Sequence, residues 1–294
     1  MPRPSKIEVS AINLRIPSAN TRNYTSLIAS ILELKQGVRV HGNSYVAITD
    51  FHEPSGMGVL SKYDEIDIDG DWFDVDDFNV AGDAAFEGVH IPENLRPNYS
   101  AFYFKLDQDA HVIAFENYSE SKSLSSRSVE RYFRTILSDD SILDAFGNVQ
   151  ADIVKSYAAV DEIFSLPDLL ELKVVIRRPN SDDLSGDLAS EIEDRLAEEN
   201  ADELEESIRT KDGQTLTPNE RTKSLSYVAA ENGSVIAKSI VNGVKTETNT
   251  DEKPLKEIVT YYKEEKNARD LFIELAKKII EAIKGFRESI RQGS

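Results

Sequence analysis

The sequence predicts an α+β protein, in which a mixed and largely antiparallel sheet domain is followed by a strand–helix–hairpin–long-helix unit. Short runs of alternating apolar and polar residues predict the strands, turn signals join two pairs of these runs into hairpins, and helical spacing of apolar residues predicts amphipathic helices. The 294 residues suffice for two ordinary domains. We therefore expect an N-terminal α+β domain at 1–165 and a C-terminal unit with an acidic helix and a long terminal helix at 166–294.

The first unit begins with a strand at 6–16, and Asn20 and Thr21 are expected to cap the helix that follows. This helix places four apolar residues on one face: Tyr24, Leu27, Ile28 and Ile31. A hairpin is expected from the strands 102–106 and 111–115. The spacing of apolar residues then predicts further helices and strands up to residue 165, where the sheet domain is expected to end.

The second unit opens with a strand whose apolar residues, Leu172, Val174 and Ile176, alternate with polar ones. This period of two is typical of a half-buried strand. Pro179 and Asn180 should end the strand, because proline cannot donate to a sheet. The pattern therefore places the pair Arg177 and Arg178 at a strand end, beside a strongly acidic stretch.

An acidic helix, a hairpin and a long helix are expected after this strand. Apolar residues recur at multiples of four and predict one amphipathic helix with a charged outer face: Leu188, Ile192, Leu196, Leu204 and Ile208. Asn242-Gly243 is a strong signal for a type I′ turn between two strands. A helix at about 266–291 closes the chain. Its apolar stripe either covers the sheet or forms a homodimer contact through 266–291.

The formal net charge of −19 is concentrated in two stretches. Residues 182–206 hold twelve acidic residues and one arginine, and residues 64–77 hold eight acidic residues and no base. Together they account for the whole net charge. A basic surface can therefore exist elsewhere, and the acidity lowers the expectation of nucleic-acid binding without excluding it.

The composition also bounds the compartment and the chemistry. Cysteine is absent, which excludes disulfides, thiolate metal sites and a cysteine nucleophile. There is no apolar run of about 18 residues and no signal-peptide pattern. We expect no membrane insertion and a cytoplasmic protein.

A calcium loop is suggested by Asp67, Asp69 and Asp71, but the pattern fails. Counted from Asp67, the sixth and twelfth positions of an EF-hand loop require Gly and Glu, and here they are Trp72 and Phe78. Acidic runs more often face water. We interpret this stretch as a solvated acidic loop.

The remaining catalytic signatures are equally incomplete. Asp168, Glu171 and Lys173 imitate a PD-ExK nuclease, yet that chemistry needs an Asp and a Glu from neighbouring strands, and these two share one. No histidine pair has metal-ligand spacing, the four histidines being His41, His52, His90 and His111. We predict no catalytic residue, no metal site and no cofactor. Whether the chain is an enzyme stays uncertain, and the sequence favours the answer no.

Basic side chains on the strand that opens the second unit are the candidate nucleic-acid contacts. Lys173, Arg177 and Arg178 would meet phosphates if they lie on its exposed side, and guanidinium groups suit that geometry. Pairing with Asp182, Asp183 or the acidic helix is the alternative. Two bases of the first domain complete the candidate set, Lys35 and Arg39.

The second half resembles RexA, the sensor of the lambda-type phage exclusion system. The likeness covers about 165–290 and rests on Leu-Glu-Leu-Lys-Val-Val-Ile-Arg-Arg-Pro followed by a helix, a polar segment, a hairpin and a long helix. The whole chain is also similar to an uncharacterised bacterial protein family of phage-defence type. The shared features are His41-Gly42-Asn43, Gly70-Asp71-Trp72-Phe73, Ile91-Pro92-Glu93-Asn94-Leu95 and Arg178-Pro179-Asn180 before two Asp.

These resemblances imply a dimeric bacterial anti-phage defence protein that senses nucleic acid, DNA in particular, without being an enzyme. Its expected partners are DNA, a second copy of the chain and a second defence protein. Two alternatives stay open. One is a metal-dependent nuclease effector using Asp67, Asp69, Asp71 or Asp74, and the other is an interaction module whose acidic helix binds a basic partner.

Overall fold

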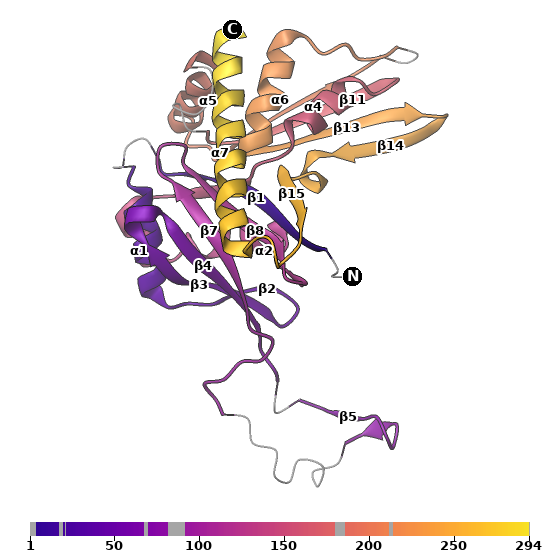
Figure 1. Cartoon of the computed structure of the whole chain (residues 1–294). Coiled ribbons are helices and arrows are strands. Elements are labelled where there is room, and N and C mark those ends of the chain that lie inside the picture. The colour runs from indigo at the N-terminus through magenta and orange to yellow at the C-terminus, as the bar shows by residue number, and fades with distance from the viewer. Residues whose placement is uncertain are drawn as a thin grey trace.

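The computed structural model describes residues 4–17, 20, 22–67, 70–81, 92–179, 186–211 and 214–293. It confirms the predicted α+β class, since helices pack on the faces of two sheets (Figure 1). Every strand pair in the described residues is antiparallel, as the hairpin signals predict.

The first sheet has nine strands, in the order β10-β1-β8-β7-β4-β3-β2, with β15 beside β1 and β9 beside β8. Its strands are β1 (Ser5–Arg15), β2 (Val38–His41), β3 (Ser44–His52), β4 (Met57–Asp64), β7 (Ser100–Asp107), β8 (Val112–Ser119), β9 (Lys122–Ser123), β10 (Gln150–Ile153) and β15 (Lys256–Tyr261). The strand β1 is central: β8 pairs along one edge, and β15 and then β10 pair along the other.

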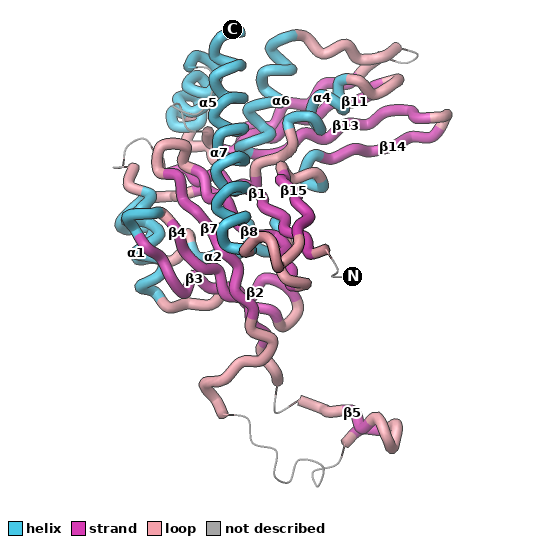
Figure 2. Tube along the Cα trace, in the orientation of Figure 1, coloured by secondary structure: helices cyan, strands magenta, loops and turns pink. Residues whose placement is uncertain are grey.

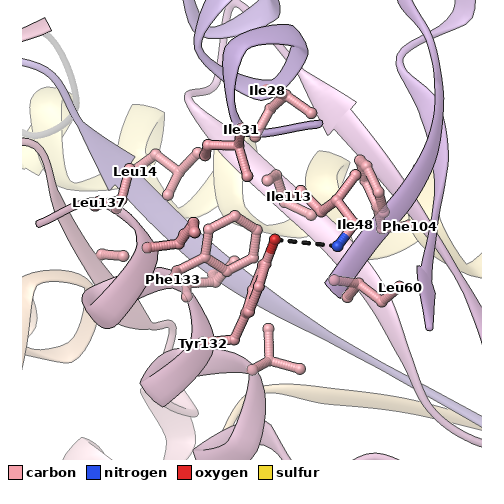
Figure 3. Packing of buried hydrophobic residues seen from close by; sticks show 14 of the residues in the cluster. Leu14, Ile28, Ile31, Ile48, Leu60, Phe104, Ile113, Tyr132, Phe133 and Leu137 are labelled. Carbon is pink, nitrogen blue, oxygen red and sulfur yellow. Dashed lines mark hydrogen bonds between the residues drawn. The ribbon is translucent and has the colours of Figure 1, made fainter. Parts of the chain in front are cut away.

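One face of this sheet carries three helices and the larger apolar core. The helices are α1 (Tyr24–Leu34), α2 (Ser126–Ile136) and α3 (Asp140–Phe146). Figure 3 shows the centre of this core, where Tyr132 and Phe133 of α2 pack among aliphatic residues. The Tyr132 hydroxyl accepts a hydrogen bond of 3.0 Å from the Ile48 amide. Its polar group is therefore satisfied inside the core.

The helix α7 (Ala268–Gly293) covers the opposite face (Figure 1). Its apolar stripe packs on β1, β7, β8 and β15, and the buried residues include Leu271, Leu275, Ile279 and Ile283. Farther along, Phe286 stacks on Tyr157. The chain's own sheet therefore covers the stripe that suggested a homodimer contact through 266–291. The stripe no longer argues for dimerisation, which stays a prediction.

The second sheet has the order β12-β11-β13-β14, and Figure 2 shows its strands β11, β13 and β14 side by side. Its strands are β11 (Leu169–Arg177), β12 (Glu203–Arg209), β13 (Gly233–Val241) and β14 (Val244–Asn249), and its helices are α4 (Tyr157–Phe164), α5 (Gly186–Glu198) and α6 (Glu220–Asn232). Leu172, Val174 and Ile176 are buried against these helices, as the alternation predicts. Asn242 and Gly243 both have positive φ and form the predicted hairpin turn.

Two predicted element boundaries are wrong. The acidic helix expected through Ile208 ends at Glu198, and the chain returns as β12 beside β11. Leu204 and Ile208 belong to β12 and pack against the core between the second sheet and its helices. Residues four apart share a face in a strand as well as in a helix. At α1 the cap is Asn23, whose side chain accepts from Ser26 N, rather than Asn20. Thr21 lies outside the described residues.

The two sheets do not divide the chain at a single point. The second sheet and its helices occupy the middle of the C-terminal half, whereas β15 and α7 return to the first sheet. A small two-stranded sheet, β5 (Phe73–Asp74) with β6 (Asn79–Val80), stands apart from both (Figure 1). Residues near the end of β11, of α6 and of α7 therefore meet the first sheet.

Candidate functional site

The predicted bases of β11 lie opposite its apolar residues, on the face of the second sheet that its helices leave uncovered, which we call the open face. Lys173 Nζ is 2.7 Å from Glu205 Oε2 on β12. Arg177 contacts Asp152 Oδ1 at 2.6 Å and Glu203 Oε2 at 3.3 Å. Both cations are thus engaged within the chain. The acidic stretch supplies partners from a strand, while Asp182 and Asp183 lie outside the described residues.

The other three predicted contacts do not join these two. Arg178 Nη2 donates to the Ala201 carbonyl at 3.3 Å, and its amide donates to Asp202 O. Lys35 is exposed in a left-handed position that ends α1. Arg39 is exposed on β2, and its guanidinium hydrogen-bonds the turn at Gly42 and Asn43. The structure therefore does not gather the five residues into one surface.

Asp152 on β10 is a fully buried carboxylate that three guanidinium groups surround. Its Oδ1 accepts from Arg134 at 2.5 Å and from Arg177 at 2.6 Å, and its Oδ2 accepts from Arg15. Burial alone would raise the pKa of Asp152, but the charges of Arg15, Arg177, Lys155 and Arg134 hold it well below its usual value. This cluster joins β1, α2 and β10 of the first sheet to β11 of the second.

A second buried ion pair joins the two sheets beside this cluster. Glu231 of α6 accepts from Arg287 of α7 at 2.6 Å and from the Tyr157 hydroxyl at 2.6 Å. Arg287 also donates to the Ala110 carbonyl at 2.9 Å. Arg15, which binds Asp152, also donates to the side chain of Asn232, the residue after Glu231, at 3.1 Å. It thereby connects the Asp152 cluster to this second ion pair. The described contacts satisfy both carboxylates, which is typical of a structural network rather than of a reactive site.

A groove of about 440 Å³ lies at the outer end of the open face. Four bases line it, Arg209, Lys211, Lys238 and Lys245, with two acids, Glu171 and Glu247. Hydrogen bonds from Arg209 at 3.0 Å and Lys238 at 3.2 Å lower the pKa of Glu171. Within the described part of the chain, the ammonium groups of Lys211 and Lys245 make no ion pair. The groove therefore carries unpaired positive charge.

A larger cavity, of about 640 Å³, lies at the beginning of α7. Its walls come from β7, β8, β15 and the loop before α7, and Glu116 and Tyr261 are among the residues that line it. Glu116 is 2% exposed and Tyr261 is 6% exposed. Glu116 Oε2 accepts from the Tyr103 amide at 2.8 Å, whereas Glu116 Oε1 and the Tyr261 hydroxyl find no hydrogen-bond partner among the described residues.

Burial dominates the electrostatics of this cavity. It raises the pKa of Glu116 to about 7, against the Tyr103 amide and the Ser119 hydroxyl, which favour the charged form. Burial, together with the nearby Glu120, also raises the pKa of Tyr261. A buried carboxyl with a strongly shifted pKa in a cavity is a standard indication of a functional site.

The acidic and histidine candidates do not assemble into a metal site. No group of three metal-ligating side chains occurs within the described residues, and Asp69 and His90 lie outside them. Asp74 accepts hydrogen bonds from the amides of Asp76 and Asp77 in its own turn. The residues that imitate a PD-ExK nuclease also form ion pairs within the chain, because Glu171 pairs with Arg209 and Lys173 with Glu205.

Sequence reasoning missed both the basic groove and the cavity. The groove needs the register that places Arg209 opposite Glu171 and Glu171 opposite Lys238. The predicted turn at Asn242-Gly243 sets only the register of β13 with β14, which places Glu247 opposite Lys238. Glu116 stands between Phe115 and Asn117, an ordinary alternation for a strand. The one signal for a buried Glu116 was its position directly after the predicted apolar strand 111–115.

Among the described helices, none is both long and apolar enough to span a membrane. A comparison with family models matches residues 5–277 to the Domain of unknown function (DUF4747). A comparison with curated proteins finds no match. Because the matched range covers nearly all of the chain, the chain belongs to the DUF4747 family.

Proposed function

We propose that this DUF4747 chain is a non-enzymatic, nucleic-acid-binding protein of bacterial anti-phage defence, and that the basic groove of the open face contacts the phosphate backbone. The groove is the observation that carries the binding proposal, because it concentrates four bases around two acids in a chain of net charge −19. The defence role rests on the resemblance of the second half to RexA. A cytoplasmic location and a second defence partner belong to the same proposal.

The proposed nucleic-acid contact is the basic groove and not the residues of β11 that the sequence favoured. Lys173 and Arg177 sit farther inward on the open face, and carboxylates already neutralise both. Lys211 and Lys245 are exposed and, within the described residues, unpaired. Binding a phosphate there would release counterions without breaking an internal ion pair. These two lysines are therefore the first contacts that we assign to nucleic acid.

The charge of the whole chain sets the character of this binding. Exposed charges interact over roughly 8–10 Å at physiological salt, so salt screens both the attraction of the groove for phosphates and the repulsion from the acidic stretches. A few lysine and arginine contacts support backbone binding without base recognition. We expect modest affinity, little sequence preference and a clear loss of binding as salt rises.

The experiment compares wild type with the double variant Lys211→Ala/Lys245→Ala, using a short labelled DNA duplex in a salt titration. The variant should bind more weakly, and its slope of log affinity against log salt should be shallower by up to about 0.9 per lost contact. A matched control is Lys277→Ala/Lys278→Ala, which removes two exposed lysines from the outer face of α7. This control should keep the wild-type slope.

Two results would contradict the proposal. Equal salt slopes in wild type, variant and control would remove the groove as the contact surface. Magnesium-dependent cleavage of the duplex would show an enzyme instead of a binder. Phage plating on cells that express wild type or the Lys211→Ala/Lys245→Ala variant tests the defence role, which predicts protection by wild type and less protection by the variant.

A further inference from the structure

The cavity at the beginning of α7 contains two buried polar atoms that the described residues leave without a partner. They are Glu116 Oε1 and the Tyr261 hydroxyl oxygen, and both residues line the cavity. Burying a polar group without a hydrogen bond destabilises the folded protein. Such groups are rare in folded proteins, and each calls for a partner. A ligand in the cavity would supply one.

We propose that this cavity binds a small organic cation, with an ammonium or guanidinium group seated on the Glu116 carboxylate and the Tyr261 hydroxyl. Both oxygens accept hydrogen bonds. An ammonium group offers three N–H donors and a guanidinium five, so either satisfies both acceptors at once. This inference is independent of nucleic-acid binding, because the cavity and the basic groove share no lining residue.

The most buried charge of the cavity, that of Glu116, determines whether the ligand is a cation or an anion. The rim carries three acids, Glu120, Glu264 and Glu265, and four bases, Lys122, Lys263, Lys266 and Arg269. Lys263 pairs with Glu120 at 2.7 Å, and Lys266 pairs with Glu274 at 3.3 Å. All seven of these residues are exposed, and water and salt weaken their fields. Glu116 is buried, so its field is screened least.

Aromatic rings strengthen the same preference. Tyr99, Tyr103 and Tyr261 line the cavity, and Tyr103 is held by a ring contact with Phe272 of α7. The negative face of a tyrosine ring attracts a nearby cation, most strongly where water is excluded. An anion gains nothing comparable from these rings. The first turn of α7 favours an anion, but it borders the rim, where bulk water competes.

Cation binding should depend on pH through the protonation of Glu116. With a pKa of about 7, the ionised fraction of Glu116 rises about tenfold between about pH 6 and pH 8. Apparent affinity scales with the binding-competent fraction, so a cation should bind about tenfold more tightly at the higher pH.

The experiment is a calorimetric titration of the full chain with methylguanidinium chloride at about pH 6 and about pH 8. Methylurea, of the same shape but uncharged, is the ligand control. We expect binding of methylguanidinium about tenfold tighter at the higher pH and no binding of methylurea. Glu116→Gln should abolish binding and its pH dependence, because the amide keeps the shape and removes the charge. Tyr261→Phe should weaken binding but keep the pH dependence.

Glu281→Gln is the matched protein control, since Glu281 is exposed on α7 outside the cavity lining and pairs with Lys277. It should leave the affinity and the pH dependence nearly unchanged. Equal binding by Glu116→Gln and wild type, or no binding by wild type, would overturn the proposal. Inorganic phosphate binding in place of methylguanidinium would overturn it too, and would show that the rim bases and the helix terminus determine the ligand.

Discussion

Two buried carboxyl groups of the first sheet, Asp152 and Glu116, show opposite solutions to the same problem. Asp152 is 0% exposed and Glu116 is 2% exposed. Asp152 meets three guanidinium groups, and its pKa lies well below the usual value because their charges outweigh burial. Glu116, in the described part of the chain, meets no guanidinium group: only the Tyr103 amide and the Ser119 hydroxyl favour its charged form, and burial raises its pKa to about 7.

The difference separates a structural carboxylate from one that is available for a ligand. The partners of Asp152 come from β1, α2 and β11, so its charge holds the two sheets together. Glu116 forms no ion pair that connects the two sheets, and its Oε1 has no partner in the described residues. Burial of charge alone therefore does not identify a functional site. Burial without compensation does, when a cavity lies beside it.

The largest effect is expected from Asp152→Asn. The substitution removes the charge and leaves Arg15 and its neighbours without their carboxylate, and breaking a buried ion pair costs about 3–5 kcal/mol. Urea unfolding at neutral pH measures this loss. Asp144→Asn on the exposed face of α3 is the matched control and should change little. A loss below about 1 kcal/mol for Asp152→Asn would show that the cluster does not join the sheets.

Glu116→Gln should have the opposite sign and a slightly smaller size. Because the folded pKa exceeds the unfolded one, wild-type stability is lost as pH rises from about 4.5 to about 7. The variant carries no such penalty, so at about pH 8 it should be more stable than wild type by about 3 kcal/mol. Near pH 4 the two should be similar. A pH-independent difference would contradict the assignment of the shift to Glu116.

Removing one guanidinium from Asp152 should cost less than removing the carboxylate. Arg177→Met leaves Arg15 and Arg134 in place, so we expect a loss of about 2 kcal/mol, typical of one charged hydrogen bond. Arg195→Met is the control, because Arg195 forms an exposed pair with Glu199 worth less than about 0.5 kcal/mol. Thermal unfolding distinguishes them. Equal losses would mean that Asp152 gains nothing from the second sheet.

The smallest effect on stability is expected at Glu171, a carboxylate of the open face. Its hydrogen bonds to Arg209 and Lys238 lower its pKa, but both partners are largely exposed. Glu171→Gln should leave the melting temperature unchanged and release both cations, so duplex DNA should bind more tightly. Weaker binding by this variant would contradict the position of the nucleic-acid contact.

Local patterns in the sequence reveal the strands, but not the partners of the buried charges. The alternation of Leu172, Val174 and Ile176 predicts the strand phase correctly, because one face of the strand is buried. The interval of four between Leu204 and Ile208 fits both a helix and a strand, and tertiary pairing with β11 decides it. Asp152 gathers Arg15, Arg134 and Arg177 from distant parts of the chain.

The cavity was beyond sequence reasoning for a related physical reason. Tyr261 lies in the last strand and joins the first sheet beside β1, so its place near Glu116 depends on a long-range pairing. No short motif encodes it. That Glu116 Oε1 has no partner among the described residues can be seen only when all neighbouring elements are in place.

The contrast between the two carboxyls is tested most directly by a carbon-13 NMR titration of the Glu116 side chain, with and without methylguanidinium. Without the cation, Glu116 should titrate near pH 7. With the cation bound, its pKa should fall toward its ordinary value of about 4.3, because the ligand supplies the charge that Asp152 receives from arginines. A Glu116 that titrates near its ordinary value in both samples would contradict the account.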